Sequence, residues 1–320
     1  MSLALVFSPQ GSQAAGMGRD LAESSIAARA VYAAADAALG WSVSETCWYG
    51  PQERLDDTRQ TQPCLLTTSV AALRALEERA RPLPAVVAGH SVGEYAALVA
   101  AGVLELDAAL RLVVRRAELM AAVDVDGSMS AVIGLDRKTV EAAVEMVGRP
   151  TELVVANDNA PGQIVISGLA EPLRAAEEAL RLAGARRVIR LPVSGPFHSP
   201  LMAGVAEQLA EAFDHERWSD ARVPVMSNVT AEPITNAGLI RALLAEQVRS
   251  PVEWTRCVER MADDGVDLAI ECGAGSALVG MIRRTAPRMR AVAVADGAGL
   301  DAAVALLAGE GAGAVVGARG

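Results

Sequence analysis

The sequence is poor in the side chains on which most metal, redox and nucleic-acid sites depend. Its 320 residues include one lysine, three histidines and four cysteines. No CxxC pair occurs, so we expect neither a zinc site nor a disulfide framework. Lys and Arg number 29 against 39 Asp and Glu, a net charge of -10. Nucleic acid and anionic membranes require basic surface, so neither is predicted as a partner.

The apolar runs of the sequence are all short. Leu3–Phe7 is the first, and neither it nor any later run has the length of a signal-peptide core or of a transmembrane helix. Hydrophobic residues still make up 52% of the chain, which is ample for a large buried core. We therefore expect a soluble, cytoplasmic, monomeric protein.

Hydrophobic periodicity divides the chain into the strands and helices of an α/β protein. Short strands are predicted at residues 3–7 and 85–88, and each leads through a turn into a helical pattern. Further helices are predicted from Pro63, placed in the first turn, to Ala80, and from Asp107, placed as the cap, to Val123.

We predict an α/β fold in two parts. Residues 1–125 and 194–305 form a large α/β-hydrolase-like domain with a mostly parallel sheet. Residues 126–193 follow the order strand-helix-strand-strand-helix-strand, which is typical of a ferredoxin-like (βαββαβ) unit and predicts an inserted subdomain. The last stretch, 306–320, is rich in Gly and Ala and is expected to be a disordered tail.

The run Gly89-His90-Ser91-Val92-Gly93 lies between a predicted strand and a predicted helix, which is the context of a nucleophile elbow. The glycines permit a tight turn, the serine projects from the bend, and the N–H of Val92 faces the position of a developing oxyanion. The alternative is an ordinary tight turn in a Gly-rich loop. The flanking strand and helix favour Ser91 as a nucleophile.

A serine nucleophile needs a base, and the sequence offers few. Lys138 lies in the polar start of a subdomain helix, and His215 lies in the charged run DHER, which indicates a solvated helix end. His90 is adjacent to the serine, but consecutive side chains at a sharp turn point apart, so a packing and hydrogen-bonding role is favoured for it. His198, in the proline-restricted run GPFHSP, is left as the favoured base.

With these residues in place, the chain resembles the malonyl-CoA:acyl carrier protein transacylases, the acyltransferases of fatty-acid and polyketide synthesis. The resemblance extends over about residues 3–295. It is carried by the ordered motifs SPQGSQ (8–13), TQPCLLT (61–67), GHSVGEYAAL (89–98), VVRRAELM (113–120), NAPGQIVISG (159–168), GPFHSPLM (195–202), SNVTAEPI (227–234) and SPVEWTRCV (250–258).

The resemblance implies a covalent mechanism. Ser91 is then the acylated nucleophile and His198 its base, positioned by the backbone carbonyl of Gln247 in place of a triad acid. The N–H groups of Gln10 and Val92 form the oxyanion hole. The sequence has Ser-Pro-Gln-Gly at residues 8–11 where the family usually has Pro-Gly-Gln-Gly. Because proline fixes φ, we expect an altered loop with an intact Gln10 N–H.

The resemblance also implies an acyl group that carries a carboxylate. Arg116 binds it, as suits a guanidinium, with the neighbouring Arg115 as the alternative. Phe197, just before the histidine, accompanies a preference for malonyl over methylmalonyl in related modular enzymes. The other substrate-binding candidates are His90, Gln62 and Asn159.

The implied reaction moves malonyl from malonyl-CoA to the phosphopantetheine thiol of an acyl carrier protein for fatty-acid synthesis, with no metal or dissociable cofactor. Two groups of arginines are either docking sites for the acidic carrier or solvated side chains on separate faces. They are residues 186, 187 and 190 and residues 283, 284, 288 and 290.

The alternative functions are those of a discrete acyltransferase of a polyketide synthase, the transacylase of a malonate decarboxylase, an acyl-carrier acyl hydrolase, an α/β-hydrolase esterase and an inactive carrier-binding scaffold.

Overall fold

The run LALVF forms strand β1 (Leu3–Phe7), as predicted, in the middle of a six-stranded sheet. The computed structural model describes residues 2–309. In the large sheet the strand order is β10-β9-β1-β2-β7-β8, with all pairs parallel except β7–β8. Its other strands are β2 (Val86–Gly89), β7 (Val225–Met226), β8 (Pro233–Ile234), β9 (Leu268–Cys272) and β10 (Arg290–Val294).

Both faces of this sheet are buried. Along β1, Leu3, Leu5 and Phe7 belong to one apolar cluster, and Ala4 and Val6 belong to another on the opposite face. A strand covered on both faces has no need of polar alternation, which explains the continuous apolar run in the sequence. The result is the mixed α/β fold with a largely parallel sheet that the sequence predicts.

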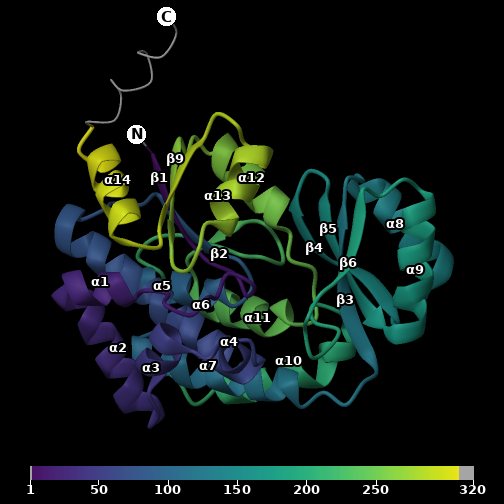
Figure 1. Ribbon diagram of the computed structural model, residues 1–320, viewed down its shortest axis with the longest axis horizontal. Coiled ribbons are helices and arrows are strands. Elements are labelled where there is room, and N and C mark those ends of the chain that lie inside the picture. Colours follow the sequence, from purple (N-terminus) through teal and green to yellow (C-terminus); the bar gives the residue numbers. More distant parts are fainter. Residues whose placement is uncertain (1, 310–320) are drawn as a thin grey trace, which may run out of the picture.

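Helices cover the sheet on its two faces (Figure 1). The larger cluster includes residues of α2, α5, α6 and α7, and the smaller cluster includes residues of α12 and α13. The helices of this part are α1 (Arg19–Ser24), α2 (Ile26–Leu39), α3 (Val43–Tyr49), α4 (Gln52–Leu55), α5 (Thr58–Ala80), α6 (Gly93–Ala100), α7 (Leu106–Ala121), the 3-10 helix η1 (Pro200–Met202), α10 (Ala203–Phe213), α11 (Ala237–Gln247), α12 (Trp254–Asp263), α13 (Ala277–Thr285) and α14 (Gly297–Leu307).

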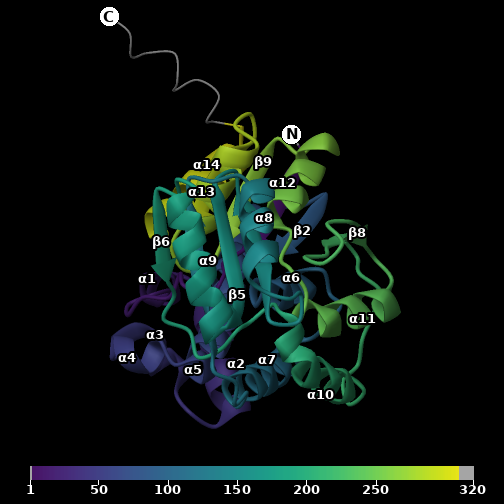
Figure 2. The same cartoon turned by 90° about the vertical axis from the view of Figure 1, so that its right-hand side faces the viewer.

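A second sheet of four antiparallel strands lies beside the first, in the order β4-β5-β3-β6. Its two helices pack on the face that points away from the large sheet (Figures 1 and 2). The elements of this subdomain are β3 (Gly127–Ile133), α8 (Arg137–Val147), β4 (Leu153–Ala160), β5 (Gln163–Leu169), α9 (Ala170–Leu182) and β6 (Arg187–Arg190).

The predicted helix starts were wrong in two places. Helix α5 begins at Thr58, capped by Asp57, so Pro63 lies inside the helix and not in its first turn. The polar run before Pro63 gives no apolar stripe, although Gln62 in it is buried against other polar groups. Helix α7 begins at Leu106 with Glu105 at the cap, and Asp107 lies in the first turn, where it pairs with Arg111.

The prediction of a disordered tail from residue 306 was also wrong at its start. Leu306 and Leu307 belong to α14, and both pack against the large core. The remainder of that predicted tail, residues 310–320, lies outside the described residues. Among residues 2–309, none of the helices combines the length and apolarity that a membrane crossing requires.

Candidate active site

Ser91 lies in a left-handed turn between the end of β2 and the start of α6. Its φ is 54°, a conformation that L-residues avoid unless the surrounding structure enforces it. The glycines on either side, Gly89 and Gly93, permit this turn because they let neighbouring backbone segments come close together. A Cβ on Gly89 would lie 2.0 Å from the backbone of Gly93, and one on Gly93 would lie 2.3 Å from the carbonyl oxygen of Phe7. Glycine at both positions is therefore a steric requirement of this turn.

His198 faces the serine from the loop before η1. Its Nε2 lies 2.7 Å from Ser91 Oγ, and its Nδ1 lies 2.9 Å from the carbonyl oxygen of Gln247. A carbonyl oxygen can only accept, so Nδ1 carries the hydrogen and Nε2 is free to accept from the serine hydroxyl. His198 also has a left-handed backbone, with φ 56°. The pair has the geometry of a nucleophile and its base.

The imidazole of His198 is held in its neutral form. Burial lowers its pKa to about 3, and the nearby positive charge of Arg116 acts in the same direction. A base must be unprotonated to accept a proton, so at neutral pH His198 is in the required state. Among residues 2–309 no carboxylate is hydrogen-bonded to this imidazole: Gln247 supplies a backbone carbonyl where an esterase triad has an acid.

Arg116 lies on the other side of the serine and is almost completely buried. Its Nη1 donates to Gln62 Oε1 at 2.6 Å, and its Nη2 donates to Ser91 Oγ at 3.0 Å and to Gln247 Oε1 at 3.2 Å. All three acceptors are neutral, and the buried Nε has no partner within the described chain. Burial lowers the pKa of this guanidinium. By contrast, Arg115 is exposed and lies against Gln208.

His90 points away from the serine. Its Nε2 donates to Asn159 Oδ1 at 2.7 Å, and its ring packs on Trp254 with the centroids 5.6 Å apart. Burial lowers the pKa of His90 to about 4, so this imidazole is neutral as well. Asn159 comes from β4, so the bond joins the subdomain to the turn that carries Ser91. Phe197 is buried in the large apolar cluster.

Two backbone N–H groups near the serine are free to act as donors. Neither the N–H of Val92 nor that of Gln10 donates to another group of the described residues. The loop with Gln10 contains Pro9, whose carbonyl accepts from the N–H of Ser12 in a tight turn. Next to the proline, Ser8 is buried and its Oγ donates to Glu271 Oε1 at 3.0 Å.

Comparison with known proteins agrees with this geometry. The model of the acyl transferase domain family matches residues 4–307. The chain belongs to the acyl transferase family. It is 40% identical to the malonyl CoA-acyl carrier protein transacylase of Escherichia coli K12 over 305 residues, 95% of this chain and 99% of that protein.

Solved structures of this acyl transferase family superpose closely on the chain. The acyl carrier protein S-malonyltransferase of Vibrio cholerae has a TM-score of 0.92 at 39% identity, covering 95% of this chain and 100% of its own. A malonyl-transacylase in complex with a type II polyketide synthase acyl-carrier protein has a TM-score of 0.91 at 38% identity, covering 95% and 99%.

Sequence reasoning missed two side chains of this acyltransferase site. Asn228 is hydrogen-bonded to the backbone of the turn at two points. Its Oδ1 accepts from the N–H of Ser91 at 2.7 Å, and its Nδ2 donates to the carbonyl of Gly89 at 2.7 Å. Glu94 is buried in the first turn of α6 and accepts from Gln247 Nε2 at 2.7 Å. Both residues lie in motifs that the sequence displays, but nothing local reveals what each one contacts.

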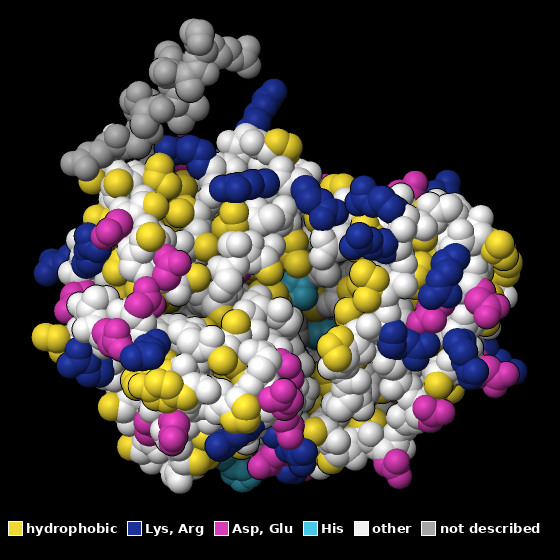
Figure 3. Space-filling model, in the orientation of Figure 1, with side chains coloured by type: hydrophobic (Ala, Val, Ile, Leu, Met, Phe, Trp, Pro, Cys, Tyr) yellow, Lys and Arg dark blue, Asp and Glu magenta, His cyan; other side chains and the backbone are white. Residues whose placement is uncertain are grey.

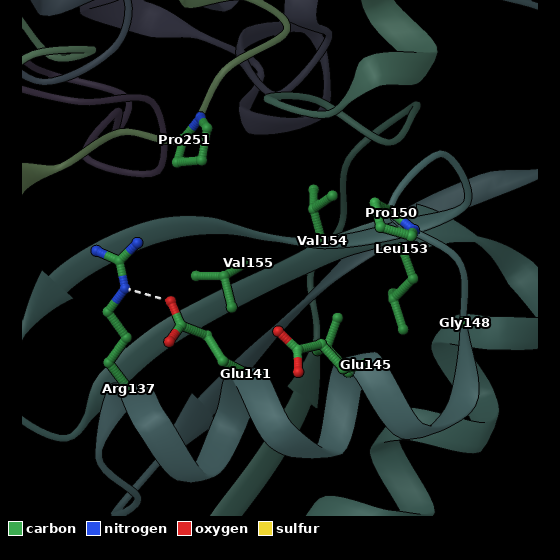
Figure 4. A pocket seen from close by; sticks show the side chains of 10 residues that line it. Arg137, Glu141, Glu145, Gly148, Pro150, Leu153, Val154, Val155 and Pro251 are labelled. Carbon is green, nitrogen blue, oxygen red and sulfur yellow. Dashed lines mark hydrogen bonds and ion pairs between the residues drawn. The ribbon is translucent and has the colours of Figure 1, made fainter.

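A groove on the subdomain lies apart from these residues (Figure 4). It runs along α8 and β4 to Pro251, and Arg137, Glu141 and Glu145 stand along it. None of the site residues lines it. Figure 3 shows a different feature, a hollow between the two parts of the molecule in which histidine side chains are visible.

Proposed function

We propose that this acyltransferase transfers a malonyl group from malonyl-CoA to the phosphopantetheine thiol of an acyl carrier protein through a malonyl-Ser91 intermediate, supplying extender units for fatty-acid synthesis. One observation carries the proposal: a buried guanidinium with only neutral partners lies 3.0 Å from the nucleophile. A buried charge that is hydrogen-bonded only to neutral groups is costly, and a bound carboxylate would relieve that cost.

The first half-reaction follows from the positions of the side chains. His198 Nε2 takes the proton of Ser91 Oγ as the oxygen attacks the thioester carbonyl carbon. The N–H groups of Gln10 and Val92 stabilise the resulting oxyanion. The intermediate collapses with cleavage of the carbon–sulfur bond, and the imidazolium returns its proton to the departing CoA sulfur.

The second half-reaction reverses the roles. The carrier thiol gives its proton to His198 and attacks the malonyl ester, and Ser91 Oγ leaves with that proton. Throughout both steps Arg116 would hold the malonyl carboxylate, and Gln62 would hold Arg116. Phe197 would exclude a methyl branch by contact with its ring, since attraction alone discriminates a methyl group by only about 1 to 3 kcal/mol.

This chemistry exchanges one thioester for another through an ester, so it needs no metal or dissociable cofactor. We also propose a cytoplasmic monomer with the predicted domain limits, except that the large domain extends through α14 to residue 307. Its large domain is α/β-hydrolase-like, and the subdomain with the order βαββαβ is ferredoxin-like. Support for these descriptions comes from the largely parallel large sheet and from the four-stranded antiparallel small one.

We place the carrier docking surface at the turn between β4 and β5. Arg284 donates to the carbonyl of Pro161 and to Gln163 Oε1 in this turn. Arg186 also lies near this turn. Its N–H donates to the carbonyl of Ile133, and the N–H of Gly134, which follows Ile133, donates to the carbonyl of Gly162 in the turn. One arginine from each group thus lies near this turn, and Lys and Arg side chains gather above and to the right of the hollow in Figure 3.

Charge reversal tests this docking surface. The double variant Arg186→Glu/Arg284→Glu should raise KM for the carrier severalfold and leave KM for malonyl-CoA unchanged. Arg174→Glu, on the outer helix α9, is the matched control. Equal changes in both KM values would place docking elsewhere.

The proposed function is tested by measuring intact mass after incubation with malonyl-CoA. The parent protein should gain one malonyl group, and Ser91→Ala should gain none. A parent protein without an adduct, or a Ser91→Ala protein with one, would overturn the mechanism. Acetyl-CoA and methylmalonyl-CoA, used in the same way, define the acyl preference.

An acyl-carrier acyl hydrolase is less well supported, because such an enzyme has no use for Arg116 at the nucleophile. A polyketide synthase acyltransferase keeps the same chemistry, and the structural relative in complex with a polyketide carrier favours it as the second candidate. Transfer assays with purified carriers of the two pathways would separate them.

A further inference from the structure

The orientation of Arg116 depends on the side-chain amide of Gln247. Arg116 Nη2 donates to Gln247 Oε1, while Nη1 is held by Gln62. An amide has a donating and an accepting end of nearly equal shape, so its contacts decide which end faces the guanidinium. If the amide turned over, its NH2 group would face the donors of Arg116, and the arginine would lose an acceptor.

Two pure acceptors prevent that reversal. Gln247 Nε2 donates to Glu94 Oε2 at 2.7 Å and to the carbonyl of Ser91 at 3.0 Å. The bond to Glu94 is the shorter of the two, and the same Oε2 atom also accepts from the N–H of Asn228, so it faces Gln247 as an acceptor. The amide oxygen is thereby directed at the arginine.

Glu94 is buried, and the charge of Arg116 acts on it without a direct ion pair between the two side chains. It is 3% exposed, and it forms no ion pair with any described residue. Its remaining contact is a long bond of 3.4 Å from the N–H of Asn228. Burial raises its pKa to about 7, which shows that the site holds the carboxylate at a cost. A glutamate kept in such a place is best explained by what its acceptor oxygen does.

We propose that Glu94 is a positioning residue that fixes the acyl-group specificity of the site, acting through the Gln247 amide to hold Arg116 in the orientation that receives a carboxylate. The proposal rests on the proposed function, since it concerns the selection of malonyl over uncharged acyl groups.

Its test compares loading by malonyl-CoA and acetyl-CoA, measured as the ratio of the two kcat/KM values. Glu94→Met removes the acceptor at similar length, and we expect the malonyl-to-acetyl ratio to fall about tenfold. Glu94→Gln retains an oxygen at the same position and should restore most of the ratio. A purely structural role would lower both rates together and leave the ratio unchanged, which would overturn the proposal.

Two further variants make the test specific. Glu177→Met alters another buried carboxylate, which bonds to Ser130 and Arg190 in the subdomain, and should lower stability without changing the ratio. Gln247→Leu removes the amide itself. If Glu94 acts through that amide, adding Glu94→Met to Gln247→Leu should lower the ratio no further, whereas additive losses would contradict the proposal.

Should Glu94→Met fail to fold, Glu94→Asp withdraws the carboxylate by one methylene and is read by the same ratio. An unchanged ratio in that variant also overturns the proposal. Failure of the proposed function is distinguishable, because the parent protein would then form no malonyl adduct at all.

Discussion

The serine side of the site and the arginine side are built in different ways. Ser91 owes its half-buried, left-handed turn to a five-residue run with glycine at both ends. Arg116, on α7, owes its position to Gln62 on α5 and Gln247 on α11, and through Gln247 to Glu94 on α6. The serine side is built on one short run, which Asn228 supports, whereas the arginine side joins four segments that are far apart in the sequence.

The two sides are held in place by different interactions, so mutations on them should have different effects. The turn is fixed by sterics that glycine alone satisfies, so its geometry is determined once the strand and helix are in place. The arginine is fixed by hydrogen bonds among buried polar groups, in which every member depends on the others being satisfied. We therefore expect losses on the arginine side to appear in specificity, and losses on the serine side to appear in stability and in catalysis of every substrate.

The largest effect should come from Arg116→Ala. Leaving a malonyl carboxylate buried without its partner costs about 2 to 5 kcal/mol, or about 30-fold to several-thousand-fold in kcat/KM for malonyl loading. Loading of acetyl should change far less. Arg116→Lys keeps the charge without the planar fork and should be intermediate. Steady-state loading assays measure all three, and normal malonyl loading by Arg116→Ala would mean that the carboxylate is held elsewhere.

A smaller effect is expected from Asn228→Ala, which tests the serine side. It leaves the N–H of Ser91 and the carbonyl of Gly89 without partners, and each unsatisfied buried group costs about 1 to 3 kcal/mol. The free energy of unfolding, measured by urea titration, should fall accordingly. Asn228→Asp keeps the acceptor for Ser91 but places a buried carboxylate against the carbonyl oxygen of Gly89, so it should lose at least as much. A fully stable Asn228→Ala protein would show that sterics alone hold the turn.

The smallest effect is the pH dependence of stability that His198 contributes. Its pKa is about 3 in the folded protein and about 6.5 in an unfolded chain, so between these values only the unfolded state binds the proton. Stability is therefore lost as pH falls below about 6.5. His198→Gln should reduce the loss between pH 7 and pH 5.5 by about 1 kcal/mol. Glu94 and His90 are present in both proteins and cancel in the comparison. Equal pH dependence of the two proteins would contradict the assignment.

The sequence was a good guide wherever the determinant was local. Strand β1 has the predicted limits, because a short, continuous apolar run is typical of a strand that is buried on both faces of a sheet. The start of α5 was missed because the residues before Pro63 are polar and give no apolar stripe, whether they are buried, as Gln62 is, or exposed, as Arg59 is. Buried polar residues such as Gln62 do not contribute to the apolar periodicity by which helices are predicted.

By itself, the sequence determined the turn at Ser91 and left His198 as its base, because glycine sterics and a shortage of other bases are visible without a fold. Only the tertiary structure decided that Arg116 and not Arg115 faces the serine, that Asn228 supports the turn, and that Glu94 reaches Gln247. The physical reason is that the cost of a buried polar group depends on its partners, and these partners come from segments far apart in the chain.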